Sequence, residues 1–446
     1  MERKIEIVCV EFIKPVSRTP SHLKCFEFSI LDQHVLTIPV PLALFYPPPP
    51  LYVGESLRAA NLSRLLVLKK SLSETLARFY PFAGRIKNNS IECNDDVVPF
   101  YEAFAHNYQL EDVLRKAADV NKKFLPSTVE EARSLLPDSA LYPPLLVQVT
   151  FFECGSMAIG ICASHKVADR ATLCTLISAW STIARGSPDY LVPEFVAAAK
   201  FLPPPISHVP PKPIMPEVII KVLFDKQRVT KIFAFDASTI TSLKGKAVSG
   251  SVQAPTRVEV VSALIWKCAM VVSGNEIRRL SQLVHNVNIR KRLVPPLPNH
   301  SVGNVVAIST ACKGENDGSD LLTLVTCIRK ALSEMSSEFA DKQNQQEAIL
   351  TIPYVNAEFA AARFGGEIEI IHMSSLCGYQ FYDVDFGWGR PSWVNPIKDI
   401  GINVVILMDS RDSGGVDAWI CLKDKDSMTV FEHELELQLL AFGSAK

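Results

Sequence analysis

The sequence predicts an α/β protein built from two domains with mixed β-sheets. The chain has 446 residues, about three times the most common domain length. Strand-like and helix-like runs are mixed in both halves, with hairpins rather than strict β-α-β alternation, which favours mixed sheets. Prolines crowd residues 203–213 near the midpoint, where they can neither continue a helix nor donate to a sheet. We therefore expect domains over 1–190 and 217–446, joined by a crossover linker over 191–216.

In the first half, apolar residues recur at helical spacing over 57–79 until a Tyr-Pro pair ends the run. Strand-like runs over 145–152 and 157–164 flank a short polar turn and predict a hairpin. A helical pattern follows over 172–184. The segment 165–169 therefore connects a strand end to a helix start.

In the second half, Thr256 is placed as the N-cap of a helix, with Glu259 three residues on completing a capping box. The patterns predict three further elements: a helix over 320–339, a hairpin over 402–408 and 416–422, and a closing helix over 427–441.

Composition excludes several classes of protein. Hydrophobic residues make up 48% of the chain, enough for a large core, and 46 basic against 47 acidic residues give a net charge of -1. The protein therefore has no net positive electrostatic field that would attract nucleic acid or an anionic membrane. The eleven scattered cysteines contain no C-x-x-C pair and predict buried, reduced thiols. With no signal peptide or long apolar span in the sequence, we expect a cytoplasmic protein.

Several common catalytic motifs are absent from the sequence. It contains no P-loop, no Rossmann glycine fingerprint, no H-E-x-x-H and no G-x-S-x-G, and its His and Cys residues lack metal-ligand spacing. These absences favour acid–base chemistry without a bound metal or a permanently bound cofactor.

His165 is the only histidine followed four residues later by an aspartate, Asp169. One interpretation is structural, with Asp169 capping the helix that starts near Arg170. The other is catalytic, because a neutral imidazole held at a strand end is well suited to accept a proton near pH 7. The small neighbours Ala163 and Ser164 leave space around the ring.

A second motif, Asp385-Phe386-Gly387-Trp388-Gly389, places two glycines around a tryptophan. Such spacing indicates positive φ angles or a close backbone approach. We interpret it as a structural turn anchored by aromatic packing, because these residue types suit shaping better than proton transfer.

A third feature is the basic stretch 285–292, which ends a strand-like run. It is either a solvated charge run or a fixed ion-pair donor. Arg290 continues an alternating apolar pattern, where a guanidinium would need a carboxylate such as Asp169 or Asp385.

The two motifs, at 165–169 and 385–389, resemble those of the BAHD acyltransferases of plant specialised metabolism, most closely the branch of alkaloid acetyltransferases. The resemblance covers nearly the whole chain and extends to Phe12-Ile13-Lys14-Pro15, Leu72-Ser73-Glu74-Thr75-Leu76, Tyr80-Pro81-Phe82-Ala83-Gly84-Arg85, Pro255-Thr256-Arg257 and Asn288-x-Arg290.

This resemblance implies two chloramphenicol-acetyltransferase-like domains with a tunnel between them. It also implies a monomer that transfers an acyl group from a coenzyme A thioester to an acceptor hydroxyl. In that family pattern His165 is the general base and Asp169 orients its loop, while Asp385 and Gly387 keep the tunnel in shape. The co-substrate is an acyl-CoA, expected to be acetyl-CoA.

The resemblance also places the CoA phosphates near Thr256 and Arg257. The amides of a capped helix start and an arginine form a suitable anion site. The alternative interpretation is an ordinary capping box, and the two are compatible.

Two departures from the family pattern fit the alkaloid branch, and the first of them bears on the acyl donor. Where hydroxycinnamoyl-transferring relatives carry Thr-Ser-Trp, this chain has Ser374-Ser375-Leu376. Ser374 remains a candidate hydrogen-bond donor to the tetrahedral oxyanion, but the missing indole weakens the case for an aromatic donor. The family's Tyr-Phe-Gly-Asn is altered to Ser301-Val302-Gly303-Asn304.

We therefore expect an acyl-CoA-dependent O-acyltransferase that acetylates a plant specialised metabolite, an alkaloid in the first instance. The alternatives are a longer or aromatic acyl donor, or a sugar, terpenoid, phenolic or amine acceptor. A non-catalytic binding protein with the same fold is a further alternative, against which the intact His165 and Asp169 argue.

Overall fold

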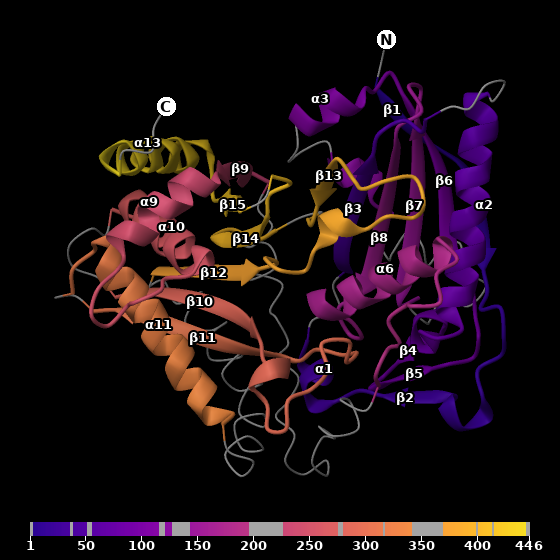
Figure 1. The fold of residues 1–446 in the computed structure, drawn as a ribbon, viewed down its shortest axis with the longest axis horizontal. Coiled ribbons are helices and arrows are strands. Elements are labelled where there is room, and N and C mark those ends of the chain that lie inside the picture. The colour runs from indigo at the N-terminus through magenta and orange to yellow at the C-terminus, as the bar shows by residue number, and fades with distance from the viewer. Residues whose placement is uncertain are drawn as a thin grey trace. The chain divides into compact units, whose positions relative to one another are not determined.

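The computed structural model describes residues 3–35, 39–50, 56–115, 121–126, 143–195, 226–274, 280–314, 317–340, 369–397, 400–412 and 414–442. Its contacts divide the chain into two compact units (Figure 1). Unit 1 comprises 1–209, 298–305 and 379–398, and unit 2 comprises 210–297, 306–378 and 399–446. No helix among the described residues is both long and apolar enough to cross a membrane.

Unit 1 contains a six-stranded mixed sheet in the order β1-β6-β7-β8-β3-β13. Only β6 and β7 are parallel neighbours, and the other pairs are antiparallel. The strands are β1 (Lys4–Ile13), β3 (Pro39–Tyr46), β6 (Val98–His106), β7 (Leu145–Phe152), β8 (Met157–Ser164) and β13 (Trp393–Asn395). A small antiparallel sheet has β2 (Cys25–Glu27), β4 (Arg85–Lys87) and β5 (Ser90–Glu92).

The helices of unit 1 are α1 (Ile30–His34), α2 (Leu57–Leu76), α3 (Leu110–Arg115) and α6 (Arg170–Ala184), with short 3-10 turns at Ser21–Leu23, Tyr80–Ala83, Asn121–Phe124 and Phe381–Asp383. Helices α2 and α6 pack against each other and lie beside the sheet (Figure 1). The buried Trp180 of α6 donates from Nε1 to Ser71 Oγ of α2 at 3.0 Å. This bond satisfies the one polar group of a large side chain in the core.

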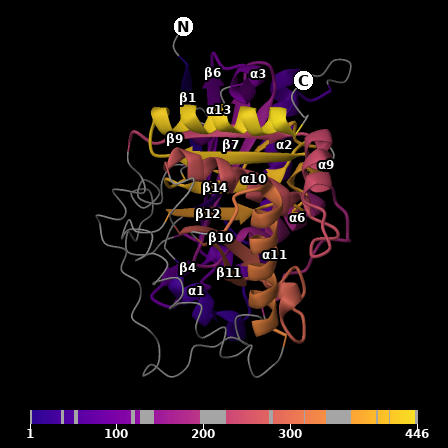
Figure 2. The ribbon, with the colours of Figure 1, turned by 90° about the vertical axis from the view of Figure 1, so that its left-hand side faces the viewer.

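Unit 2 contains a second six-stranded mixed sheet in the order β11-β10-β12-β14-β15-β9. Its strands are β9 (Val229–Phe235), β10 (Ser281–Asn288), β11 (Val306–Lys313), β12 (Glu369–Ser375), β14 (Val404–Asp409) and β15 (Val416–Leu422). Its helices are α9 (Ala237–Lys246), α10 (Arg257–Val272), α11 (Leu321–Glu338) and α13 (Lys425–Ala441), with a 3-10 turn at Arg290–Arg292. Figure 2 shows α10, α11 and α13 in front of this sheet.

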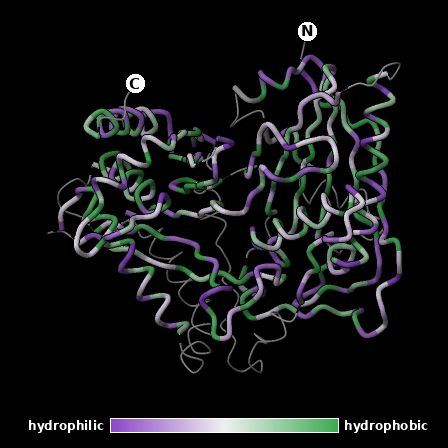
Figure 3. Tube along the Cα trace, in the orientation of Figure 1, coloured by the Kyte–Doolittle hydropathy of each residue, from purple (hydrophilic) through white to green (hydrophobic). Residues whose placement is uncertain are grey.

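The hydrophobic pattern explains why these elements pack as they do. All eight residues of β8 are buried, as expected of a strand covered on both faces. In unit 2, α10 contributes Trp266 and its apolar neighbours to the core shared with β14 and β15. Figure 3 shows hydrophobic and hydrophilic residues along the Cα trace in the orientation of Figure 1.

The sequence predictions of mixed sheets and of the main elements are confirmed. The predicted strands 145–152 and 157–164 coincide with β7 and β8. The predicted helix over 57–79 ends at 76 because the Tyr-Pro pair forms a 3-10 turn instead. The helix predicted over 172–184 begins two residues earlier, because Asp169 caps its first turn.

The domain organisation differs in detail from the expected boundaries. Segments 298–305 and 379–398, which the sequence assigns to the domain 217–446, belong by their contacts to unit 1. The second segment supplies β13, which pairs antiparallel with β3 as the edge strand of that sheet (Figure 1). Most of the expected crossover linker 191–216 lies outside the described residues, which stop at 195 in this region.

The expectation of buried thiols is wrong for four cysteines. All eleven cysteines are free, but Cys9, Cys25, Cys154 and Cys312 are exposed. Three of these lie on the sheet-edge strands β1, β2 and β11, and Cys154 lies in the turn between β7 and β8. Edge strands and turns face solvent, so a strand-like sequence around a cysteine does not ensure burial.

Candidate active site

His165 lies in the tight turn that joins β8 to α6. Ser164, the last residue of β8, accepts hydrogen bonds at its carbonyl from the amides of Val167 and Ala168, both at 3.1 Å. These bonds fold the chain back immediately after the strand. The imidazole is only partly exposed and is held at the end of a fully buried strand. A rigid strand end of this kind fixes a side chain better than a loop tip does.

The contacts of Asn304 determine which nitrogen of His165 carries the proton. Asn304 Nδ2 donates to Asp32 Oδ1 at 2.8 Å and to the carbonyl oxygen of His165 at 2.7 Å. Both partners are acceptors, so the amide orientation is fixed, and Asn304 Oδ1 faces His165 Nδ1 at 2.9 Å. An amide oxygen only accepts, so Nδ1 bears the hydrogen. His165 Nε2 is therefore left with a lone pair that can accept a proton.

Asp32 anchors Asn304 from the start of α1. Its carboxylate accepts from the backbone amide of Asn304 at 2.7 Å as well as from Nδ2. Ser29 also donates to it, from the backbone amide at 3.0 Å and from Oγ at 2.6 Å, and completes the capping box of α1. Burial raises the pKa of Asp32, and the hydrogen bonds from Ser29 and Asn304 oppose that shift. We call Asp32, Asn304 and His165 the base relay.

Asp169 makes structural contacts with the backbone. Its Oδ1 accepts from the amide of Thr172 at 2.8 Å as the N-cap of α6, and its Oδ2 accepts from the amide of Val305 at 3.2 Å. Thr172 Oγ1 in turn bonds to both the amide and the carbonyl of Gly303 at 3.1 Å. Asp169 therefore ties the helix start to the segment that carries Asn304.

Burial and a neighbouring cation keep His165 neutral. Burial lowers the pKa of His165 below its ordinary 6.5, and the positive charge of Arg170 lowers it further. The charge of Asp169 and the contact with Asn304 act in the opposite direction without cancelling the shift. The imidazole is thus in its basic form at neutral pH.

The motif at 385–389 is a turn closed by its aspartate. Asp385 Oδ1 accepts from the amides of Gly387 at 2.7 Å and Gly389 at 2.9 Å. The two glycines have φ angles of 110° and 98°, which side chains disfavour. The buried Phe386 meets Trp180 edge to face at 5.0 Å and stacks on Trp388. This geometry matches the structural interpretation of the motif.

Replacing Asp385 by alanine is expected to lower the melting temperature. Two turn amides lose their acceptor, which costs about 1–3 kcal/mol for each group left unsatisfied away from water and less where water replaces it. Asp385→Asn keeps an acceptor oxygen and serves as the matched control, with a smaller loss. Thermal unfolding of the two variants measures the difference, and an unchanged melting temperature for Asp385→Ala would contradict the structural role.

Arg290 is fully buried just after β10. Its Nη1 donates to Asn288 Oδ1 at 3.2 Å, and its carbonyl accepts from the amide of Leu297 at 2.9 Å. It is therefore no part of a solvated charge run. The expected pairing of Arg290 with Asp169 or Asp385 stays a prediction. Asp385 already accepts hydrogen bonds from two amides of its own turn.

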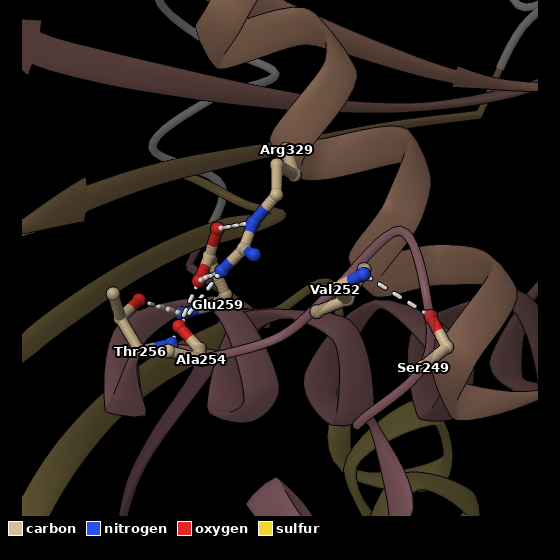
Figure 4. A network of polar contacts seen from close by, with 6 residues as sticks. All are labelled: Ser249, Val252, Ala254, Thr256, Glu259 and Arg329. Carbon is tan, nitrogen blue, oxygen red and sulfur yellow. Dashed lines mark hydrogen bonds and ion pairs between the residues drawn. The ribbon is translucent and has the colours of Figure 1, made fainter.

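The helix start at Thr256 is a complete capping box (Figure 4). Glu259 donates from its amide to Thr256 Oγ1 at 3.2 Å, and its Oε2 accepts from the amide of Thr256 at 2.7 Å. Arg329 of α11 clamps the same carboxylate at 2.8 and 2.9 Å. A carboxylate thus already occupies the positive end of α10. The capping interpretation accounts for Thr256 without a bound phosphate.

Arg257 points to a carboxylate rather than to open solvent. Its Nη2 is paired with Asp409 Oδ1 at the end of β14. The other oxygen of Asp409 accepts from the amide of Gly378 at 2.7 Å. The Arg257 side chain remains about 30% exposed, so other N–H groups of its guanidinium stay accessible.

Ser374 lies on β12 in parallel register with Asn286 of β10. Asn286 Nδ2 donates to Ser374 Oγ at 2.9 Å. Since the serine oxygen is the acceptor in this bond, its hydroxyl hydrogen is available to donate elsewhere. Ser374 is half-buried. It remains a candidate hydrogen-bond donor to the tetrahedral oxyanion.

The sequence analysis missed the roles of Asp32 and Asn304. One signal was available, since Ser29-x-x-Asp32 has the spacing of a capping box and marks a helix start. Asn304 was noted only as part of an altered motif. Its contact with His165 joins residues 139 apart in sequence, which local patterns do not reveal.

One cluster of possible metal ligands exists among the residues that the structure describes, formed by Cys9, Glu11 and Glu102. Lys69 Nζ pairs with both carboxylates, with Glu11 at 2.8 Å. An ammonium group therefore already offsets part of this negative charge, and the cluster lies on the strands β1 and β6.

Comparison with known proteins places the chain in a family. The model of the Transferase family matches residues 3–438. The chain is 35% identical to epi-neemfruitin B 7-O-acetyltransferase of Melia azedarach and 34% identical to vinorine synthase of Rauvolfia serpentina, in both cases over 98% of each chain. The crystal structure of vinorine synthase matches with a TM-score of 0.77 at 33% identity over 96% of each chain, which confirms the predicted fold. The chain therefore belongs to the BAHD acyltransferases.

Proposed function

We propose that this acyltransferase moves an acetyl group from acetyl-CoA to a hydroxyl of a plant specialised metabolite, an alkaloid or a terpenoid. The observation that carries the proposal is the base relay, which fixes the hydrogen of His165 on Nδ1 and leaves the lone pair of the imidazole on Nε2. The relatives named above are, by their names, a 7-O-acetyltransferase and vinorine synthase, and stemmadenine O-acetyltransferase of Catharanthus roseus is 33% identical over 97% of each chain. These names support an acetyl donor and an oxygen acceptor.

In the proposed mechanism, His165 Nε2 accepts the hydroxyl proton while the acceptor oxygen attacks the thioester carbonyl carbon. The imidazolium that forms keeps its Nδ1 hydrogen bond to Asn304 Oδ1. The tetrahedral intermediate then collapses, the carbon–sulfur bond breaks, and Nε2 returns the proton to the CoA sulfur. Asp32 takes no proton and holds the amide of Asn304 in the orientation that receives Nδ1–H.

Asp169 is proposed as a positioning residue for this base. Its carboxylate joins the amides of Thr172 and Val305, so it fixes the α6 start against the segment carrying Asn304. Both of its oxygens are engaged, which argues against a direct proton transfer. Ser374 is proposed as a donor to the oxyanion of the intermediate, because its hydroxyl hydrogen is not used by Asn286.

Arg257 is proposed as the phosphate contact for CoA, while Thr256 acts as a helix cap. Arg257→Ala is expected to raise the KM for acetyl-CoA about tenfold with little change in kcat, because a hydrogen bond to a charged group contributes about 1.5–3 kcal/mol. Asp409→Asn is the matched control: it frees Arg257 from its ion pair and is expected to leave the KM unchanged or lower it. Steady-state kinetics with varied acetyl-CoA measure both, and equal KM values for the parent and Arg257→Ala would contradict this contact.

Two acceptor classes remain candidates. Vinorine synthase and stemmadenine O-acetyltransferase support an alkaloid, whereas limonoid 7-O-acetyltransferase of Citrus sinensis, 34% identical over 98% of each chain, supports a terpenoid. Release of free CoA thiol tests the function directly, with a panel of acyl-CoAs and of alkaloid and limonoid alcohols. We expect turnover with acetyl-CoA. Turnover with other donors and none with acetyl-CoA for any acceptor would overturn the acetyl assignment.

A further inference from the structure

Arg170 is the first residue of α6 and follows His165, the proposed base, by five residues. Its Nη1 donates to the carbonyl of Pro41 on β3, and its Nη2 donates to the carbonyl of Pro396 at 2.7 Å. Pro41 pairs with Cys162 of β8, three residues before His165, and Pro396 directly follows β13. The guanidinium is therefore fixed at the end of the sheet where β8 delivers His165.

No carboxylate of the described residues forms an ion pair with Arg170. Its hydrogen bonds go to two carbonyl oxygens, and a guanidinium has five N–H groups, so further donors remain. Burial lowers the pKa of Arg170 only to about 10, so the group stays protonated at neutral pH. The residue as a whole is half-buried, but the guanidinium itself is shielded from water, which is why its pKa is lowered.

The other charged groups around His165 are already engaged in hydrogen bonds within the protein. The Asp32 carboxylate accepts four hydrogen bonds from Ser29 and Asn304, and Asp169 binds two backbone amides. Lys166 donates from Nζ to the carbonyl oxygens of Asp32 and Gln33 at 3.4 and 2.8 Å, toward α1. Both carboxylates are buried and hydrogen-bonded, and the Lys166 ammonium is held toward α1, so the guanidinium of Arg170 is the cation near the imidazole that no carboxylate in the described part of the chain compensates. Its charge already acts on His165, whose pKa it lowers, and it would act in the same way on a molecule bound beside the imidazole.

We propose that Arg170 is a specificity-determining residue that selects the charge of the acceptor. It disfavours alcohols that carry a protonated amine and favours neutral alcohols with a carbonyl, ester or ether oxygen that accepts its N–H groups. This inference rests on the proposed acyl transfer at His165. It favours an oxygen-rich terpenoid over a basic alkaloid as the natural acceptor.

The test compares three cyclohexanols that differ only in the group opposite the hydroxyl: dimethylamino, isopropyl and methoxycarbonyl. The first two have nearly the same shape, but the amine is protonated at pH 7. With acetyl-CoA and the parent enzyme, we expect kcat/KM for the isopropyl alcohol to exceed that for the amine at least tenfold, with the ester highest. Arg170→Gln should reduce the ratio of the first two below threefold, and Arg170→Lys should keep it.

A parent enzyme that uses the ammonium alcohol as well as its isostere would overturn the proposal, whatever the variants do. So would an Arg170→Gln enzyme with the parent's melting temperature and an unchanged ratio. If no acyl-CoA supports transfer to any alcohol, the proposed function fails. Calorimetric binding of the same pair then decides the role of Arg170: a tenfold preference that Arg170→Gln abolishes supports it, and equal or undetectable binding of both refutes it.

Discussion

Replacing His165 by alanine is expected to lower kcat/KM for acyl transfer at least about 100-fold, the typical loss when a general base is removed. The fold should survive, because the imidazole is partly exposed and contributes little to the packed core. The KM for acetyl-CoA should stay near the parent value, since Arg257 and not His165 is the proposed phosphate contact. Thiol release with saturating acetyl-CoA measures the loss, and the melting temperature checks the fold.

His165→Asn is the control that separates chemistry from structure. Its Nδ2 can replace Nδ1–H as the donor to Asn304 Oδ1, but it provides no base. We expect it to be as inactive as the alanine variant while melting closer to the parent. An alanine variant as active as the parent would refute the role of His165 and favour a non-catalytic or differently catalysed function.

Removal of the Asn304 side chain is expected to lower kcat about 10- to 100-fold without changing the KM for acetyl-CoA. Asn304→Ala deletes the acceptor of His165 Nδ1–H and the donor to Asp32. The imidazole then loses the contact that fixes both its orientation and its tautomer, so Nε2 no longer presents its lone pair consistently. Steady-state kinetics with both substrates varied provide the comparison.

Asn304→Asp tests whether this residue acts on the base or only on the fold. A carboxylate at this position still accepts from Nδ1–H, and its negative charge raises the pKa of His165. The acid side of the pH–rate profile should therefore move to higher pH. At pH values above this acid-side pKa, the activity of Asn304→Asp should exceed that of Asn304→Ala. Asn304→Asp also loses the Nδ2 donor and sets its second oxygen against Asp32 Oδ1, so the melting temperature is expected to fall. Equal activities of the two variants, with no movement of the profile, would reduce Asn304 to a structural residue.

Sequence patterns predicted the elements that local physics determines. The strands β7 and β8 were placed correctly because apolar runs bounded by turn residues define them. The caps at Thr256 and Asp169 followed from side chains that bond to the nearby helix amides. The positive φ angles of Gly387 and Gly389 likewise followed from the residue type.

What the sequence could not predict depends on contacts between distant segments. The pairing of Arg257 with Asp409, 152 residues away, has no counterpart in the local sequence pattern. The attachment of β13 to the first sheet is set by strand pairing across more than three hundred residues. The same holds for the base relay, in which Asn304 reaches Asp32 over 272 positions. Such pairings follow from topology and not from periodicity.

The pH dependence of kcat/KM for acetyl transfer tests the central claim most directly, because it reports the ionisation of the free enzyme's base. A neutral imidazole is the active form, so the rate falls as the pH falls through the pKa of His165. Burial and the charge of Arg170 lower that pKa, which predicts an acid limb with its midpoint below 6.5 that disappears in His165→Ala. A midpoint above 6.5, or the same limb in His165→Ala, would contradict the account.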